Sequence, residues 1–192
     1  MYSKELFRNV IAVSNRHLCD RQIEIQIERI CAYHPKAIVL REKDLSEEAY
    51  YHLAKRVTAI CKRNGILCIL HSFADVARRL DHQALHLPLP LLRQYRGGLN
   101  DFNLLGTSVH TLEEAREAKQ YGVDYAVAGH IYATGCKPGI EPRGVEFLSH
   151  LCRNVKLPVY GIGGINLDKE QMAELLTAGA RGGFIMSAMM KL

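Results

Sequence analysis

Short apolar segments alternate with amphipathic segments along the whole chain. The apolar segments are four to six residues long and mostly continuous, which is the pattern of parallel strands buried on both faces. They predict strands at 10–13, 37–40, 66–70, 84–87, 104–109, 125–128, 158–162 and 182–186. A parallel pair needs a crossover connection, and each intervening segment is long enough to supply one.

The segments between the strands place apolar residues at helical spacing and begin with helix start signals. Ser46 and Thr111 are N-cap residue types that stand directly before such segments, and a further helix is expected to begin at Asp168. Residues 23–27 also alternate as a strand does, but their apolar spacing continues to residue 31. We therefore interpret 23–31 as a helix and expect Asp20 to be its N-cap.

Eight strands joined by crossover helices predict an α/β fold, a single (β/α)₈ TIM barrel that spans residues 1–192. The alternative is an open doubly wound sheet. That fold usually carries a glycine fingerprint at its first turn, and Ser14-Asn15-Arg16 is not one.

We expect the last helix of this barrel to be truncated or missing, because only residues 188–192 follow Ser187. Five residues make ~1.4 helical turns, too few to cover a strand. We expect the groove between the last and first strands to expose Ile11, Val13 and Ile185, or their neighbours, beside the methionines at 189 and 190. Exposed apolar patches usually mark interfaces, so a homo-oligomer is expected. The N-terminal residues 1–7 are the alternative cover.

Charge and composition narrow the class of ligand. The net charge of +5 comes from scattered residues with no basic run, so no nucleic-acid partner is expected. No apolar stretch reaches membrane-spanning length, and the polar residues 1–9 do not resemble a secretory signal. With no C-x-x-C pair, the thiols suggest neither a zinc nor a redox motif, and a cytoplasmic location is expected.

Barrel enzymes carry their chemistry where strands end, and the sixth strand has the strongest candidate there. His130 follows Gly129 and precedes a polar loop that contains Thr134 and Lys137. Other polar strand-end positions are Asn15, Arg41, Lys43, His71, His86, Ser108 and His110. A lone histidine at such a position is more often structural, but the glycine and the loop favour a functional His130.

Two further groups of residues are suited to an anionic ligand. Gly163 and Gly164 offer backbone N–H groups after the seventh strand, and Met186 and Ser187 do so after the eighth. Barrels often hold phosphate between these two loops. Arg41 and Lys43 alternate with an acidic residue, so both can face an anion from one side of their strand end; the alternative is a solvated charge cluster.

Five segments, 40–43, 106–111, 128–137, 161–165 and 186–188, together resemble the thiamine phosphate synthase superfamily. The resemblance covers nearly the whole chain and is closer to the thiazole tautomerase (TenI-like) branch. The synthase has Asn-Asp where this chain has His71-Ser72, and Gly-Gln-x-Asp where it has residues 88–91, Pro-Leu-Pro-Leu. Where this chain has His130, the synthase has a proline and the tautomerase branch has a histidine.

The resemblance implies an isomerase that aromatises a carboxythiazole phosphate tautomer by proton transfer. His130 would be the acid/base, since an ordinary histidine titrates near neutral pH. The substrate would be bound by Arg41, Lys43, His71, Ser108, Thr134 and Lys137, and its phosphate by Gly163, Gly164, Met186 and Ser187. No cofactor and no metal are expected. The alternatives are the synthase itself, a transferase, or a regulatory barrel that binds a thiazole phosphate without turnover.

Overall fold

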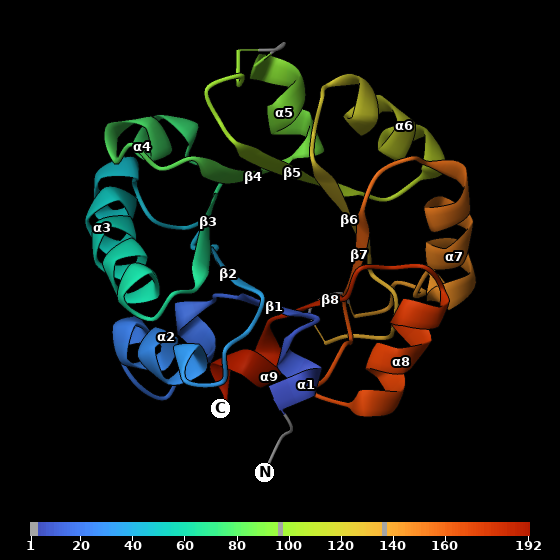
Figure 1. Ribbon diagram of the computed structural model, residues 1–192, viewed down its shortest axis with the longest axis horizontal. Helices are drawn as coiled ribbons and strands as arrows, with labels where there is room; N and C mark the ends of the chain where they lie inside the picture. The colour runs from blue at the N-terminus through green and yellow to red at the C-terminus, as the bar shows by residue number, and fades with distance from the viewer. Residues whose placement is uncertain (1–3, 96–97, 136–137) are drawn as a thin grey trace.

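The computed structural model describes residues 4–95, 98–135 and 138–192, and it shows a closed barrel of eight parallel strands (Figure 1). The strands follow one another around the barrel in chain order, and β1 pairs with β8 to close it. They are β1 Val10–Val13, β2 Ala37–Leu40, β3 Leu67–His71, β4 Ala84–Pro88, β5 Leu104–Val109, β6 Tyr125–Gly129, β7 Val159–Ile162 and β8 Gly183–Ile185. The expected TIM barrel is confirmed, and the doubly wound sheet is wrong.

Helices form a ring around the strands (Figure 1). They are α1 Lys4–Phe7, η1 Arg16–Leu18, α2 Ile23–Cys31, α3 Glu47–Arg63, α4 Ala74–Arg79, α5 Leu89–Tyr95, α6 Leu112–Gln120, α7 Gly144–Asn154, α8 Lys169–Thr177 and α9 Ser187–Met190. Within the described ranges, no helix combines the length and apolar character that a membrane crossing requires.

Most of the expected helix starts are confirmed. Ser46, Thr111 and Asp168 each accept a hydrogen bond from the backbone N–H three residues later. The segment 23–31 is helical, but its N-cap is Gln22, so the expectation of Asp20 is wrong. Gln22 makes no side-chain cap. The buried face of α2 therefore fixes this helix, because most helical stability in proteins comes from packing.

Two apolar layers hold the barrel together. The inner layer fills the barrel, and on β1 it takes Ile11 and Val13. The outer layer lies between strands and helices, and it takes Val10 and Ala12 from the same strand. Our expectation that Ile11 and Val13 face outward is wrong, because successive side chains alternate and the phase is the opposite one.

The groove between β8 and β1 is covered from within the chain. Helix α9 is only four residues long, as expected for a truncated last helix, and it contacts η1, whereas α1 contacts β1. Phe7, Ile185, Met189 and Met190 are all buried. The expected exposed edge is therefore wrong. Leu6 and Phe7 are buried in the same apolar layer as Ile185, Met189 and Met190, which agrees with the N-terminal alternative. The homo-oligomer loses its supporting observation and stays a prediction.

Phe7→Ala is expected to lower the free energy of unfolding by about 3–5 kcal/mol, as for other buried aromatic truncations. Phe7 is fully buried and stacks on Tyr33 with ring centroids 4.9 Å apart. Urea unfolding followed by circular dichroism measures this loss. Ile25→Ala is the control, because Ile25 is 55% exposed and should cost no more than about 0.5 kcal/mol. Equal effects of the two variants would show that α1 does not hold the groove closed.

Candidate active site

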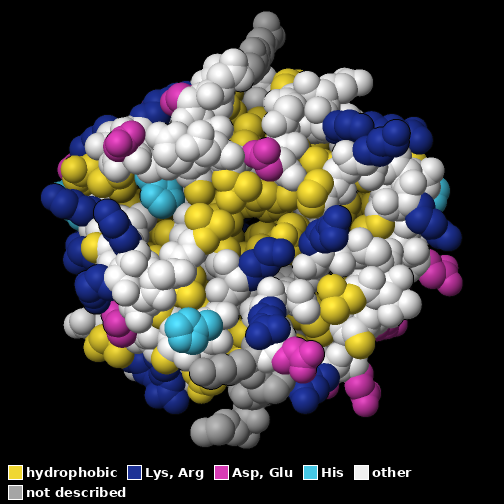
Figure 2. All heavy atoms as spheres, in the orientation of Figure 1, with side chains coloured by type: hydrophobic (Ala, Val, Ile, Leu, Met, Phe, Trp, Pro, Cys, Tyr) yellow, Lys and Arg dark blue, Asp and Glu magenta, His cyan; other side chains and the backbone are white. Residues whose placement is uncertain are grey.

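The carboxyl ends of the strands surround a pocket of about 520 Å³. Figure 2 looks onto one end of the barrel and shows apolar side chains gathered around its centre, with cationic side chains near them. Apolar side chains line part of the pocket, namely Val13, Val127, Ile162, Ile165, Phe184 and Met186. Its polar lining includes Arg41, Lys43, His71, Ser108, His110, His130, Thr134, Asn166 and Ser187.

Nearly all of the site residues expected from the sequence meet in this pocket. Beyond the polar residues just named, Gly163, Gly164 and Met186 also line it. Lys137 lies outside the described residues. Two other strand-end positions are not in the lining: Asn15 caps η1 by accepting from the His17 N–H, and His86 is buried within the barrel.

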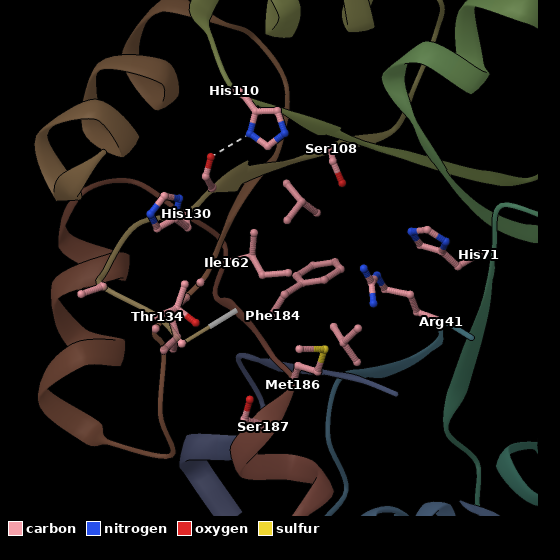
Figure 3. A pocket seen from close by; sticks show the side chains of 18 of the residues that line it. Arg41, His71, Ser108, His110, His130, Thr134, Ile162, Phe184, Met186 and Ser187 are labelled. Atoms are coloured by element: carbon pink, nitrogen blue, oxygen red, sulfur yellow. Dashed lines mark hydrogen bonds between the residues drawn. The ribbon is translucent and has the colours of Figure 1, made fainter. Parts of the chain in front are cut away.

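His130 lies directly after β6, at the edge of the pocket (Figure 3). The side chain is nearly buried, and Nε2 is 3.2 Å from the carbonyl oxygen of Ile140. A carbonyl only accepts hydrogen bonds, so this contact requires a hydrogen on Nε2 and leaves the lone pair of the neutral ring on Nδ1. The backbone is fixed as well, because the Arg143 N–H donates to the His130 carbonyl at 2.9 Å.

Glycines let the loop after β6 approach the loop after β7. A Cβ at Gly129 would lie 2.5 Å from Cγ2 of Ile162, and one at Gly163 would lie 2.3 Å from Cβ of His130. Gly163 also has φ +97°, a backbone conformation that residues with a side chain rarely adopt. These glycines therefore position His130 whether or not a phosphate binds beside them.

The phosphate assignment has one supporting observation in this loop. Outside the strand pairing, the backbone N–H of Gly164 donates to no backbone carbonyl in the part of the chain that the structure describes. Gly163 and Gly164 both line the pocket and have positive φ, the geometry in which successive N–H groups can form an anion nest. Phosphate binding here stays a prediction.

Arg41 and Lys43 both line the pocket, as their alternation along the chain indicates. Glu42, between them, points the other way and is buried. Its carboxylate accepts from the hydroxyl of Ser14 at 2.6 Å and from the backbone N–H of Arg16 at 3.1 Å. The solvated charge cluster is thus wrong for Glu42, which instead ties the loops after β1 and β2 together.

The pocket carries positive charge with few groups to offset it. Burial, and then the charge of Arg41, lowers the pKa of Lys43 from its usual value. Burial also lowers the pKa of His71 well below its ordinary value, and the positive charges of Arg41 and Lys43 lower it further, so this imidazole is neutral at physiological pH. Among the described residues that line the pocket, none is Asp or Glu. The arrangement suits an anionic ligand.

His110 lines the pocket, although it is not among the binding residues expected from the sequence. Its Nδ1 lies 2.8 Å from the carbonyl oxygen of Gly129, so Nδ1 carries a hydrogen and Nε2 is the acceptor (Figure 3). The signal was present, because Ser108 and His110 stand two residues apart at one strand end and so face the same side.

The donor set does not fit a magnesium-bound diphosphate. Magnesium takes oxygen ligands, usually from one or two carboxylates. Here His71, Ser72 and Pro88 stand at the ends of β3 and β4. In the described ranges, no group of three or more His, Cys, Asp or Glu residues is placed to hold a metal ion.

Comparison with known sequences gives one consistent family. The family model for thiamine monophosphate synthase matches residues 10–189. The thiamine-phosphate synthase of Syntrophomonas wolfei is 33% identical over 159 residues, which cover 80% of this chain and 74% of that protein. The thiamine-phosphate synthase of Moorella thermoacetica is 36% identical over 158 residues, 79% of this chain and 73% of its own.

Solved structures agree on the fold. The thiamine phosphate pyrophosphorylase from Pyrococcus furiosus superposes with a TM-score of 0.81 at 26% identity, covering 97% of this chain and 89% of its own. The N-acetylmannosamine-6-phosphate 2-epimerase from Clostridium perfringens has a TM-score of 0.65 at 18% identity, covering 97% and 90%. The second likeness concerns the barrel alone.

Gly163→Ala is expected to displace His130, because the new methyl group overlaps its Cβ. The overlap should cost about 1–3 kcal/mol of stability beyond the backbone strain. Nitrogen-15 NMR signals of the His130 ring and urea unfolding measure the two effects. Gly122→Ala is the matched control, with φ +75° and no atom within 4 Å, so it carries strain of about 1–2 kcal/mol alone. An unmoved His130 signal in Gly163→Ala would contradict the packing argument.

Proposed function

The chain belongs to the thiamine monophosphate synthase family, and within that family we propose that it is a thiazole tautomerase. The proposed substrate is the carboxythiazole phosphate tautomer released by thiazole synthase, and the product is its aromatic isomer. One observation carries the proposal: His130 lies at the end of β6, in a pocket with two cations whose described lining contains no carboxylate.

The charges of the pocket fit both ends of that substrate. Arg41 lies across the pocket from His130 (Figure 3), and Arg41 and Lys43, which both line the pocket, are assigned to the ring carboxylate. The backbone N–H groups of Gly163, Gly164, Met186 and Ser187 are assigned to the phosphate. Because these two sets come from β2 and from β7–β8, they would hold the thiazole ring between them.

The proposed reaction moves one proton and changes no oxidation state. A base removes the ring proton, the ring electrons shift toward the exocyclic double bond, and the exocyclic carbon receives a proton. A histidine serves both steps, since it accepts a proton at one nitrogen and returns it. His130 has its lone pair on Nδ1 when Nε2 donates to Ile140. Aromatisation drives the shift, so no cofactor is needed in the proposal.

The second candidate is thiamine-phosphate synthase itself, which the names of the relatives favour. The synthase would join a pyrimidine diphosphate to the thiazole phosphate and release diphosphate with magnesium. The described residues at the ends of β3 and β4 supply no carboxylate for that metal, and this favours the isomerase. A non-catalytic barrel that binds thiazole phosphate is the remaining alternative.

One experiment separates these functions. The purified protein is mixed with the product of thiazole synthase, and aromatisation is followed by ultraviolet absorbance. A parallel sample contains aromatic thiazole phosphate, a pyrimidine diphosphate and magnesium, and is assayed for diphosphate release. The tautomerase accelerates only the first reaction, the synthase only the second. Binding of the thiazole phosphate without either reaction would support the regulatory barrel.

His130→Asn is expected to lower kcat for aromatisation by roughly 10²-fold or more, the usual contribution of a positioned acid/base. Circular dichroism should show an unchanged fold. His52→Asn is the control, because His52 lies exposed on α3. Wild-type kcat in His130→Asn would remove this residue from the mechanism.

Treatment with EDTA is expected to leave the rate of aromatisation unchanged, because the proposed proton transfer uses side chains alone. The rate is measured before and after dialysis against the chelator, and again after magnesium is added back. A rate abolished by EDTA and restored by magnesium would overturn this expectation and favour the synthase.

A further inference from the structure

A chain of hydrogen bonds runs from the wall of the pocket into the interior of the barrel. Ser108, on β5, lines the pocket, and its Oγ lies 2.9 Å from Nε2 of His86 on β4. The other ring nitrogen of His86, Nδ1, lies 3.1 Å from the hydroxyl of Tyr125 on β6. His86 and Tyr125 are both buried, and neither lines the pocket.

Gly106 makes this series of hydrogen bonds possible. The strand register places Gly106 of β5 between His86 on one side and Tyr125 on the other. A Cβ at position 106 would lie 2.0 Å from Cζ of Tyr125. The tyrosine ring therefore crosses over β5 where that strand has no side chain, and its hydroxyl reaches a histidine two strands away. A glycine inside a strand often marks such a close approach.

Burial fixes the protonation states of His86 and Tyr125 in this series of hydrogen bonds. Burial, followed by the charges of Lys43 and Arg41, lowers the pKa of His86 to about 3, so its ring is neutral at physiological pH and carries one hydrogen. Burial raises the pKa of Tyr125 above its usual range, so the hydroxyl keeps its hydrogen. A neutral His86 ring has two tautomers, and they differ in which buried hydrogen-bonding group they leave without a partner.

Hydrogen-bond satisfaction selects one tautomer. Within the described residues, Nδ1 of His86 is the one hydrogen-bond partner of the Tyr125 hydroxyl. If Nδ1 carried the hydrogen, the tyrosine O–H would be buried among aromatic rings without an acceptor, which is costly. The tyrosine therefore donates to Nδ1, the ring hydrogen lies on Nε2, and Nε2 donates to Oγ of Ser108.

The tautomer of His86 affects the hydroxyl of Ser108, which lines the pocket. Because the oxygen of Ser108 accepts from His86, its own hydrogen is free to be donated to a ligand. The hydroxyl of Ser108 points into the pocket, on the side where His71 and Arg41 lie (Figure 3). We propose that Tyr125 and His86 are positioning residues that fix the Ser108 hydroxyl as a hydrogen-bond donor to the ligand's carboxylate. The identity of that carboxylate rests on the proposed function, but the tautomer does not.

The tautomer is tested without any substrate. Nitrogen-15 NMR distinguishes protonated from unprotonated ring nitrogens, and the His86 signals are assigned by their loss in His86→Asn. The expected wild-type spectrum has a protonated Nε2 and an unprotonated Nδ1. In Tyr125→Phe the two nitrogens should move toward mixed protonation, while Tyr160→Phe, another tyrosine of the inner layer, should leave them unchanged. A wild-type His86 protonated at Nδ1 would overturn the proposal.

The consequence for the ligand is tested by kinetics. Ser108→Ala should raise KM for the carboxythiazole phosphate about tenfold, the range for a hydrogen bond to a charged group. Tyr125→Phe should raise KM about twofold, because mixed protonation leaves the donating tautomer about half populated. Their effect on kcat should be smaller. The double variant should be no worse than Ser108→Ala, because both changes remove one interaction. Additive losses, or an unchanged KM in Tyr125→Phe, would refute the positioning role. If the wild type shows no turnover, the proposed function fails, and the NMR result still decides the tautomer.

Discussion

The contact between the loop after β6 and the loop after β7 is the constraint on which the rest of the site depends. No side chain fits at Gly163, because Cβ of His130 occupies that space. Backbone hydrogen bonds join the same loops, from Ile131 to the Ile162 carbonyl and from Tyr132 to the Gly163 carbonyl, at 2.9 and 3.0 Å. The proposed acid/base and the proposed phosphate loop therefore form one rigid unit, and a change in either one alters the position of the other.

The sequence predicted the barrel well because continuous apolar strands and capped helices are local signals. It predicted the pocket nearly as well, since parallel strands bring their carboxyl ends together whatever the loops do. It failed on the direction of Ile11 and Val13, because a strand buried on both faces has no polar position to reveal its phase. The exposed edge was inferred from the short last helix instead, and it is wrong because Ile185, Met189 and Met190 are buried all the same.

Contacts between residues far apart in the sequence were the other feature that could not be predicted from the sequence alone. Glu42 reads as part of a charged surface run, but Ser14 and Arg16, which bury it, lie 28 and 26 residues earlier. The bond between His86 and Tyr125 likewise joins residues 39 apart, across a glycine. Family membership does not replace such contacts. It establishes the barrel, whereas the reaction depends on which side chains stand at a few strand ends.

The position of Glu42 also bears on how this pocket selects a ligand. Since that carboxylate is bound to Ser14 and Arg16, it faces away from the pocket and leaves Arg41 and Lys43 open to many small anions. Inorganic phosphate or a simple carboxylate would engage one end of the pocket only. A molecule with an acid group at each end gains from effective concentration, because the first contact holds the second group near its partner. Selectivity would then come from the spacing between two charges rather than from the strength of either contact.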